Sequence, residues 1–246
     1  MKTNKMLSID KYHCGIIIPV YNSADHIAEL LQKIGEVQNR QRRWVFNILI
    51  VDDGSEPELP ACKQSGLIVE QIRHNSNMGK GAALQSGFRY FLDNEQIEPI
   101  VTMDGDLQHP PEYLPHFLKK FETENSQVVV GYRQRNPKVM PLHRIVSNTL
   151  TSLIISGMTG QMVRDSQCGY RLYSRTVLER MTFGENRFHL ESEMLIRCGW
   201  LRIPIDFTPI PTIYNSAPSA INNLADTWDF ISLIIRMTAR RLTGHV

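Results

Sequence analysis

The chain has 246 residues, of which 42% are hydrophobic and 21% charged, and its formal net charge is +2. That composition is typical of a globular protein, and so small a net charge gives no field that would attract nucleic acid. The four cysteines form no Cys-x-x-Cys pair, which indicates free thiols in a reducing compartment and argues against a zinc site. The polar N-terminus and the absence of a long apolar run predict neither a signal peptide nor a membrane-spanning helix.

Taken in order, the chain alternates short apolar runs with helical periods. Strands are expected at 14–19, 45–51, 67–72, 100–103 and 128–131. A first helix is expected from Ser23, which can cap it, to about Val37, and a second follows Gly81. The apolar face of the first helix comprises Ile27, Leu30, Leu31 and Ile34. This alternation predicts stacked βαβ units with a mostly parallel sheet.

Three loops rich in Asp, Gly, Asn and Lys follow these strands, at 52–55, 75–81 and 104–108. The carboxyl ends of parallel strands meet at one edge of a sheet, and open α/β sheets bind their ligands there. We therefore expect the three loops to converge on one site.

The last of these loops has the composition of a metal site. Asp104 and Asp106 are separated only by Gly105, so both carboxylates can turn toward one hard cation, and Gln108 adds a neutral oxygen. These ligands are too few for a calcium cage and suit Mg²⁺ or Mn²⁺ shared with substrate phosphates. The tripeptide alone leaves open a simple polar turn. Pro111 then marks the first turn of a helix.

Two common nucleotide motifs are absent around Lys80. The Gly79–Leu84 segment lacks the third small residue of a dinucleotide-binding turn, and it comes after the third strand rather than the first. A phosphate-binding loop would need Ser or Thr after Lys80, where Gly81 stands. The remaining parts are carboxylates for a base and ribose, a Gly-Lys turn and a carboxylate pair for a metal. Together they can hold a nucleoside diphosphate.

The order of these motifs resembles a family 2 glycosyltransferase with the GT-A fold, most like the polyprenyl-phosphate (dolichyl-phosphate-mannose-synthase-like) branch. The matching segments are 18–22, 50–55, 77–81, 103–112, 129–133, Arg144 and 165–173. The resemblance implies an α/β fold with a Rossmann-like, mostly parallel sheet flanked by helices. It also implies an N-terminal extension at 1–13, one catalytic domain at 14–215 and an amphipathic helical tail at 216–246.

The resemblance also implies roles for single residues. Tyr21 is expected to stack near the nucleobase, Asp52 and Asp53 to bind base and ribose, and Lys80 to lie near the phosphates. The nucleotide-binding set is Pro19, Tyr21, Asn22, Asp52, Asp53, Lys80 and Gly105. Asp104, Asp106 and Gln108 resemble the family's metal and diphosphate site. Ser23 stands where the family often has Glu.

Arg133 and Arg144 resemble the pair that meets the lipid phosphate in this branch, and their guanidinium forks suit a phosphate; surface arginines are the alternative. A phosphate acceptor needs no general base, whereas a sugar hydroxyl does. Candidates for that base are Glu191, Glu193 and, third, Asp165. On a helix Glu191 and Glu193 diverge by about 200°, so we expect at most one to face the site and the other to lie solvated at the helix start. His109 is expected to support the acidic turn rather than to bind metal.

The predicted function is inverting transfer of a sugar from a UDP- or GDP-sugar to a polyprenyl phosphate or related lipid, with Mg²⁺ or Mn²⁺. Transfer to a sugar hydroxyl, and a binding subunit without turnover, stay open as alternatives. Apolar stretches at 142–162 and from Leu224, the latter leading into Arg236, Arg240 and Arg241, predict peripheral contact with a membrane surface or a membrane partner. The cytoplasmic face is the expected location. Burial of both stretches in the core is the alternative.

Overall fold

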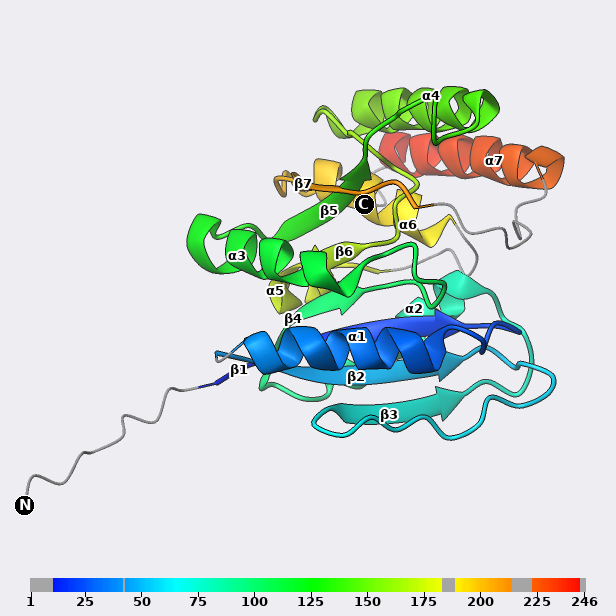
Figure 1. Cartoon of the computed structure of the whole chain (residues 1–246). Coiled ribbons are helices and arrows are strands. Elements are labelled where there is room, and N and C mark those ends of the chain that lie inside the picture. Colours follow the sequence, from blue (N-terminus) through cyan, green and yellow to red (C-terminus); the bar gives the residue numbers. More distant parts are fainter. Residues whose placement is uncertain (1–10, 42, 183–188, 214–222, 244–246) are drawn as a thin grey trace, which may run out of the picture.

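The computed structural model describes residues 11–41, 43–182, 189–213 and 223–243. Over these ranges the chain forms a seven-stranded sheet in the order β3-β2-β1-β4-β6-β5-β7, flanked by helices (Figure 1). All strands run parallel except β6, which is antiparallel to both β4 and β5. The predicted single α/β domain with a mostly parallel sheet is confirmed.

The first half of the chain builds four parallel strands. They are β1 (Tyr12–Val20), β2 (Trp44–Asp52), β3 (Ile68–Arg73) and β4 (Ile97–Thr102). The helices between them are α1 (Ile27–Arg40) and α2 (Lys80–Leu92). β1 and β2 are continuous apolar runs because helices cover both faces of the sheet, and their side chains form the centre of the core. The chain reverses its winding between β1 and β4, where open α/β sheets bind ligands.

The second half closes the sheet and adds a helical layer. Its strands are β5 (Val128–Arg133), β6 (Arg171–Tyr173) and β7 (Asp206–Ile210). Its helices are the short η1 (Pro111–Tyr113), α3 (Leu114–Glu124), α4 (Leu142–Thr159), α5 (Arg175–Glu179), α6 (Leu190–Trp200) and α7 (Asn223–Leu242). α4 and α7 lie side by side at the end of the molecule farthest from β3 (Figure 1), and Arg241 donates to the Met158 carbonyl.

The predicted strands all form, with ends that differ by a few residues. Ser23 does not cap the first helix: α1 begins at Ile27 after His26, which makes no side-chain cap. The apolar face of α1 is buried as expected. The apolar pattern predicted neither β6 nor β7, because both strands are short and each begins with a charged residue, Arg171 and Asp206. β1 already begins at Tyr12, inside the predicted extension, and the predicted boundary at 215 lies outside the described residues.

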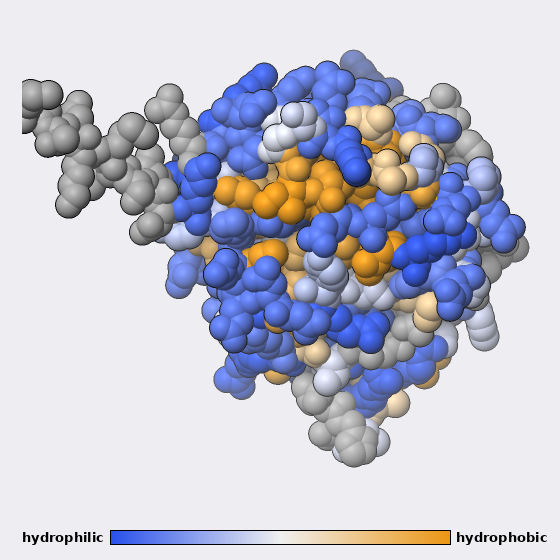
Figure 2. Space-filling model, turned by 90° about the horizontal axis from the view of Figure 1, so that it is seen from below, coloured by the Kyte–Doolittle hydropathy of each residue, from blue (hydrophilic) through white to orange (hydrophobic). Residues whose placement is uncertain are grey.

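β3 forms one free edge of the sheet. Figure 2 views the molecule from this side and shows apolar patches separated by polar side chains. Ile68 of β3 is 46% exposed there, whereas Val69 and Ile72 pack partly against the core. No helix in the described ranges is both long enough and apolar enough to cross a bilayer.

The packing of α4 against α6 depends on a glycine. A Cβ at Gly199 of α6 would lie only 2.4 Å from Thr159 Cα, whereas a Cβ at Gly157 of α4 would meet nothing within 4 Å. We expect Gly199→Ala to lower the free energy of unfolding by about 1–3 kcal/mol, because the backbone of α4 must shift. Gly157→Ala, the matched control, should raise it by about 0.5–1 kcal/mol.

Thermal unfolding of the two variants checks this prediction. For a chain of this size, each 1 kcal/mol corresponds to about 2–4 °C in Tm. Equal Tm values for both alanine variants would contradict the close approach of α4 and α6.

Candidate active site at the carboxyl edge of the sheet

The loops at the carboxyl ends of neighbouring strands are joined by hydrogen bonds and ion pairs. After β1, the backbone N–H of Asn22 donates to Ser55 Oγ at 2.9 Å. The side-chain oxygen of Asn22, Oδ1, accepts from the backbone N–H of Glu56 at 2.8 Å. After β2, Asp53 accepts hydrogen bonds from the loop that follows β3. That loop leads to Lys80, which contacts the turn after β4. The predicted convergence of the three loops is therefore observed.

The centre of this edge is an ion cluster around Lys80, at the start of α2. Lys80 Nζ lies 2.7 Å from Asp104 Oδ1 and 3.2 Å from Glu191 Oε1 of α6. Burial alone would lower the pKa of Lys80, but the two carboxylates raise it above its usual value. Burial would raise the pKa of Asp104, but Lys80, with His109 and Arg133, lowers it to about 2. Lys80 and Asp104 are therefore both charged at neutral pH.

Gly169 lies directly against this cluster. A Cβ at this position would be 2.7 Å from Glu191 Oε1 and 2.8 Å from Lys80 Nζ. The Gly169 carbonyl accepts a hydrogen bond from Thr102 Oγ1 at 2.7 Å, which fixes the loop against the end of β4. A side chain at position 169 would displace the ion cluster, so the absence of one is a requirement of the site.

The Asp104–Gln108 turn presents oxygen ligands at the surface of the cluster. Asp104, Asp106 and Gln108 are partly exposed, and Asp106 Oδ1 accepts the Gln108 amide at 3.0 Å. Buried Gly105 lets Ile27 of α1 pack beneath the turn, since a Cβ would lie 2.9 Å from Ile27 Cδ1. Two carboxylates and an amide oxygen on an open turn fit Mg²⁺ or Mn²⁺ that takes its other ligands from a substrate. Within the described ranges, no three His, Cys, Asp or Glu side chains gather into a metal site by themselves.

Buried His109 supports this turn from the interior of the protein. Its Nδ1 accepts a hydrogen bond from the Asp104 amide at 3.0 Å, and its ring stacks on Tyr170. Burial lowers the pKa of His109, and an imidazole that accepts at Nδ1 carries its proton on Nε2. Because Nδ1 is occupied, His109 orients the turn rather than binding a cation.

Asp52 and Asp53, predicted to bind base and ribose, are both buried and hydrogen bonded within the protein. Asp52 accepts from the Ser55 amide at 2.8 Å and pairs with Arg73. Asp53 accepts the Met78 and Gly79 amides at 3.0 and 2.7 Å, and it contacts His74 Nδ1 at 2.7 Å. Their roles as nucleotide ligands stay predictions, and in this structure both carboxylates shape the loops.

Tyr21 is more accessible than Pro19, which lies in the same predicted base-binding segment. It follows β1 and is 48% exposed, whereas Pro19 lies within β1 opposite Val51. A half-exposed ring at the carboxyl edge offers a free face for stacking. The nucleobase assignment of Pro19 and Tyr21 stays a prediction.

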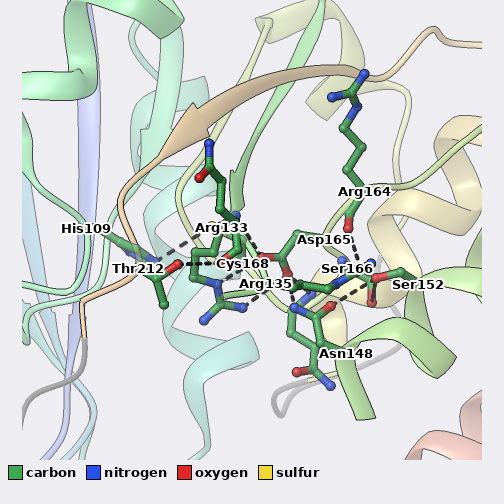
Figure 3. Close-up of polar contacts among 12 residues, drawn as sticks. His109, Arg133, Arg135, Asn148, Ser152, Arg164, Asp165, Ser166, Cys168 and Thr212 are labelled. Carbon is green, nitrogen blue, oxygen red and sulfur yellow. Dashed lines mark hydrogen bonds and ion pairs between the residues drawn. The ribbon is translucent and has the colours of Figure 1, made fainter. Parts of the chain in front are cut away.

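Arg133, at the end of β5, is engaged by a buried carboxylate (Figure 3). Its Nε and Nη2 donate to the two oxygens of Asp165 at 2.9 and 3.1 Å, and Asn148 of α4 donates to Asp165 as well. Arg144 lies one turn before Asn148 on α4 and is partly buried, so it faces the same side. The fork of Arg133 thus grips Asp165 here, and a joint phosphate site with Arg144 stays a prediction.

The two glutamates of α6 diverge, as their spacing predicts. Glu191 faces Lys80, and Glu193 faces the opposite side, where its Oε1 lies 2.8 Å from Arg197 Nη2 and 3.6 Å from Arg240 Nη1 of α7. The expectation of a solvated second glutamate is wrong, because Glu193 is fully buried. The C-terminal helix covers this side of α6, which no local pattern could indicate.

Arg171 had no predicted role, yet it is the largest fully buried side chain among the described residues. Its guanidinium donates to the carbonyls of Ser166, Cys168 and Glu191 at 2.8, 2.7 and 2.6 Å. It therefore joins the loop that carries Gly169 to the start of α6. Because β6 itself was not predicted from the sequence, no local signal marked Arg171 as a buried residue.

The chain is similar to known proteins in both sequence and structure. The family model described as glycosyl transferase family 2 matches residues 15–182. An uncharacterized protein of Methanocaldococcus jannaschii is 30% identical over 220 residues, which is 87% of each chain. The undecaprenyl-phosphate 4-deoxy-4-formamido-L-arabinose transferase of Pseudomonas fluorescens is 33% identical over 175 residues, 69% of this chain and 49% of the transferase. The chain thus spans about half the length of that relative.

Solved structures share the fold. Mannosyl-3-phosphoglycerate synthase from Rubrobacter xylanophilus superposes with a TM-score of 0.68 at 18% identity, covering 95% of this chain and 74% of that enzyme. Glucosyl-3-phosphoglycerate synthase from Mycobacterium tuberculosis, in complex with UDP, gives a TM-score of 0.65 at 19% identity, covering 92% and 80%. These similarities confirm the GT-A architecture.

The buried position of Asp53 yields a prediction. Asp53→Asn should lower the Tm of the ligand-free protein by several degrees, because the amide nitrogen cannot accept one of the loop hydrogen bonds. Thermal unfolding without ligand measures this effect. A purely ribose-binding Asp53 would instead leave the ligand-free Tm unchanged and lower only nucleotide affinity, and that result would overturn the structural role.

Proposed function

Since this chain belongs to glycosyltransferase family 2, we propose that it transfers a sugar from a nucleotide-diphosphate sugar to a polyprenyl phosphate, with inversion at the anomeric carbon. The observation that carries the proposal is the Lys80–Asp104–Glu191 cluster beside the open Asp104–Gln108 turn. It lies at the winding reversal of the sheet, where a diphosphate fits.

The donor half of the site combines fixed charges with exposed oxygens. Lys80 brings a cation to the edge where the diphosphate would lie, and Asp104 and Asp106 offer carboxylates that would hold Mg²⁺ or Mn²⁺. A divalent cation there supplies a Lewis acid that stabilises negative charge on the leaving diphosphate. The Mycobacterium tuberculosis enzyme with the same fold was crystallised with Mn²⁺ and UDP-glucose, which supports this assignment.

The ion pairs made by the acidic residues favour a phosphate acceptor over a sugar hydroxyl. A hydroxyl needs a carboxylate that can take up its proton. Each candidate is already held by a cation: Glu191 by Lys80, Glu193 by Arg197 and Asp165 by Arg133. Burial alone would raise the pKa of Asp165, but Arg133 lowers it below its usual value. This carboxylate is therefore a poor base. A phosphate acceptor is already ionised near neutral pH and needs no base.

Two exposed apolar stripes favour a lipid acceptor. On α4 the stripe comprises Leu142, Val146, Leu150 and Leu153, and on α7 it comprises Trp228, Ile231, Ile235 and Leu242. Their spacing places each set on one outward helical face, and Arg236 and Arg241 lie on the same α7. Aliphatic and aromatic side chains next to arginines suit the surface of an anionic bilayer. The similarity to transferases named for undecaprenyl phosphate points the same way.

The first test of the proposal targets the acidic turn. With undecaprenyl phosphate in detergent, Mn²⁺ and a panel of UDP- and GDP-sugars, nucleotide release should depend on the lipid. Asp104→Asn and Asp106→Asn should each lower kcat by about 10²-fold or more, because a ligand of the cation is lost. Asp93→Asn, an exposed carboxylate after α2, is the matched control. Activity close to wild type in either variant at limiting Mn²⁺ would refute the metal assignment.

The second test concerns the stripes. The double variant Leu150→Ser/Ile235→Ser should bind anionic vesicles about 10²-fold more weakly, or weaker still, than the wild type in flotation at low salt, because each side chain contributes about 1.5–3 kcal/mol when buried in lipid. Ile68→Ser, at the opposite edge of the molecule, is the control and should bind normally. Equal flotation of the double variant and the wild type would contradict docking through α4 and α7.

A further inference from the structure

A pocket of about 480 Å³ lies between the end of β5, one face of α4 and the loop after α4. Its walls include Tyr132, Arg133 and Arg135 from β5 and the segment after it, Leu153 from α4, and Met162 and Arg164 from the loop. None of the described lining residues is acidic. The pocket lining does not include the Lys80 cluster, and of the lining residues only Arg133 has been given a predicted role so far.

The charge in this pocket comes mainly from two arginines. The guanidinium of Arg133 is neutralised by Asp165, as described above. Arg135 donates one hydrogen bond to the Arg164 carbonyl at 2.6 Å. The Arg164 guanidinium stacks over the Tyr132 ring at 5.0 Å, and its side chain extends away from Asp165 in Figure 3. A wall with two such guanidinium groups and no carboxylate attracts an anion, and phosphate suits the guanidinium fork.

The remaining wall is apolar and continuous with the α4 stripe. Leu153 lines the pocket and also belongs to the α4 stripe, and its side chain is 63% exposed. Met162, 76% exposed, lies at the pocket wall just beyond the end of α4. A ligand that fits such a pocket carries an anion at one end and hydrocarbon at the other. The hydrocarbon end can leave the pocket along the apolar face of α4.

Arg133 links the pocket to the loop that carries Gly169. This residue lines the pocket and donates to Asp165 in that loop. A Cβ on Gly169, at the other end of the loop, would lie 3.2 Å from Asp104 Oδ1. Asn148 and the Gln167 backbone amide also donate to Asp165, and these bonds fix the carboxylate that binds the Arg133 guanidinium. The pocket and the Lys80 cluster are thus joined by the loop from Asp165 to Gly169.

We propose that this pocket binds the phosphate and first prenyl units of the acceptor lipid, with Arg135 and Arg164 as its phosphate ligands and Leu153 and Met162 as its prenyl wall. The proposal rests on the proposed function, and it assigns acceptor recognition to residues outside the Arg133–Arg144 pair.

Direct binding to the 246-residue chain tests the pocket without catalysis. Farnesyl phosphate, a soluble prenyl phosphate, is titrated calorimetrically against the wild type, with inorganic phosphate and farnesol as the two half-ligands. We expect farnesyl phosphate to bind more tightly than either. Arg135→Gln and Arg164→Gln should each raise its Kd about tenfold or more, because a charged hydrogen bond is lost. Lys138→Gln removes an exposed charge from the same segment outside the pocket and should leave the Kd unchanged.

A further variant tests the pocket in case the arginine variants do not fold. Met162→Asp keeps both arginines, alters an exposed position and places a negative charge at the apolar wall, so it should weaken farnesyl phosphate binding while Tm is retained. The proposal is overturned if inorganic phosphate binds as tightly as farnesyl phosphate. It is also overturned if Arg135→Gln and Arg164→Gln bind like Lys138→Gln.

The same variants separate this proposal from the proposed function. In the transfer assay, Arg135→Gln and Arg164→Gln should raise the KM for the lipid phosphate several-fold and leave the KM for the donor unchanged. If transfer is abolished by Asp104→Asn but unaffected by either arginine variant, the function stands and the pocket assignment fails. If farnesyl phosphate binds as predicted but no lipid phosphate is glycosylated, the pocket stands and the proposed reaction fails.

Discussion

The largely buried charge of Lys80 is the constraint on which this active-site edge depends. An ammonium group removed from water is very unfavourable unless carboxylates surround it. Asp104 and Glu191 meet that requirement, and they come from a turn and a helix that are far apart in the sequence. Their shared contact fixes the start of α2, the turn after β4 and the start of α6 relative to one another. Gly169 is required at the same point, because only a residue without a side chain leaves room for the three charged groups.

A second layer of paired charges surrounds this centre. Arg171 binds three backbone carbonyls, Asp165 holds Arg133, and Glu193 is held by Arg197 and Arg240. These pairs keep the loops rigid, and they leave each candidate base neutralised by a cation. A site so arranged can orient charged substrates well, but it is poorly equipped to remove a proton. Ionised acceptors are therefore the substrates that suit it, which links the electrostatics of the fold to the proposed chemistry.

The apolar surface of α4 and α7 has a different origin. Each helix buries one side, through Ile155 in α4 and through Leu233 and Met237 in α7, and exposes a second apolar stripe on its outer side. A helix that only covers the core needs a single apolar face. The additional stripe of α4 includes Leu153, which also lines the arginine-rich pocket. The proposed phosphate ligands and the apolar face of α4 are therefore continuous.

The sequence by itself determined the strands from β1 to β5, the parallel α/β architecture and the acidic turn, because apolar runs, glycines and prolines act locally. It also indicated that Glu191 and Glu193 face opposite ways, since helical geometry alone requires this. Only the tertiary structure decided which charges meet: Lys80 with Glu191, Arg133 with Asp165, and Glu193 with Arg240. It likewise revealed that Asp52 and Asp53 are buried and that Arg171 organises the loop that carries Gly169. The physical reason is that ion pairing and burial are set by residues distant in sequence, about which local periodicity carries no information.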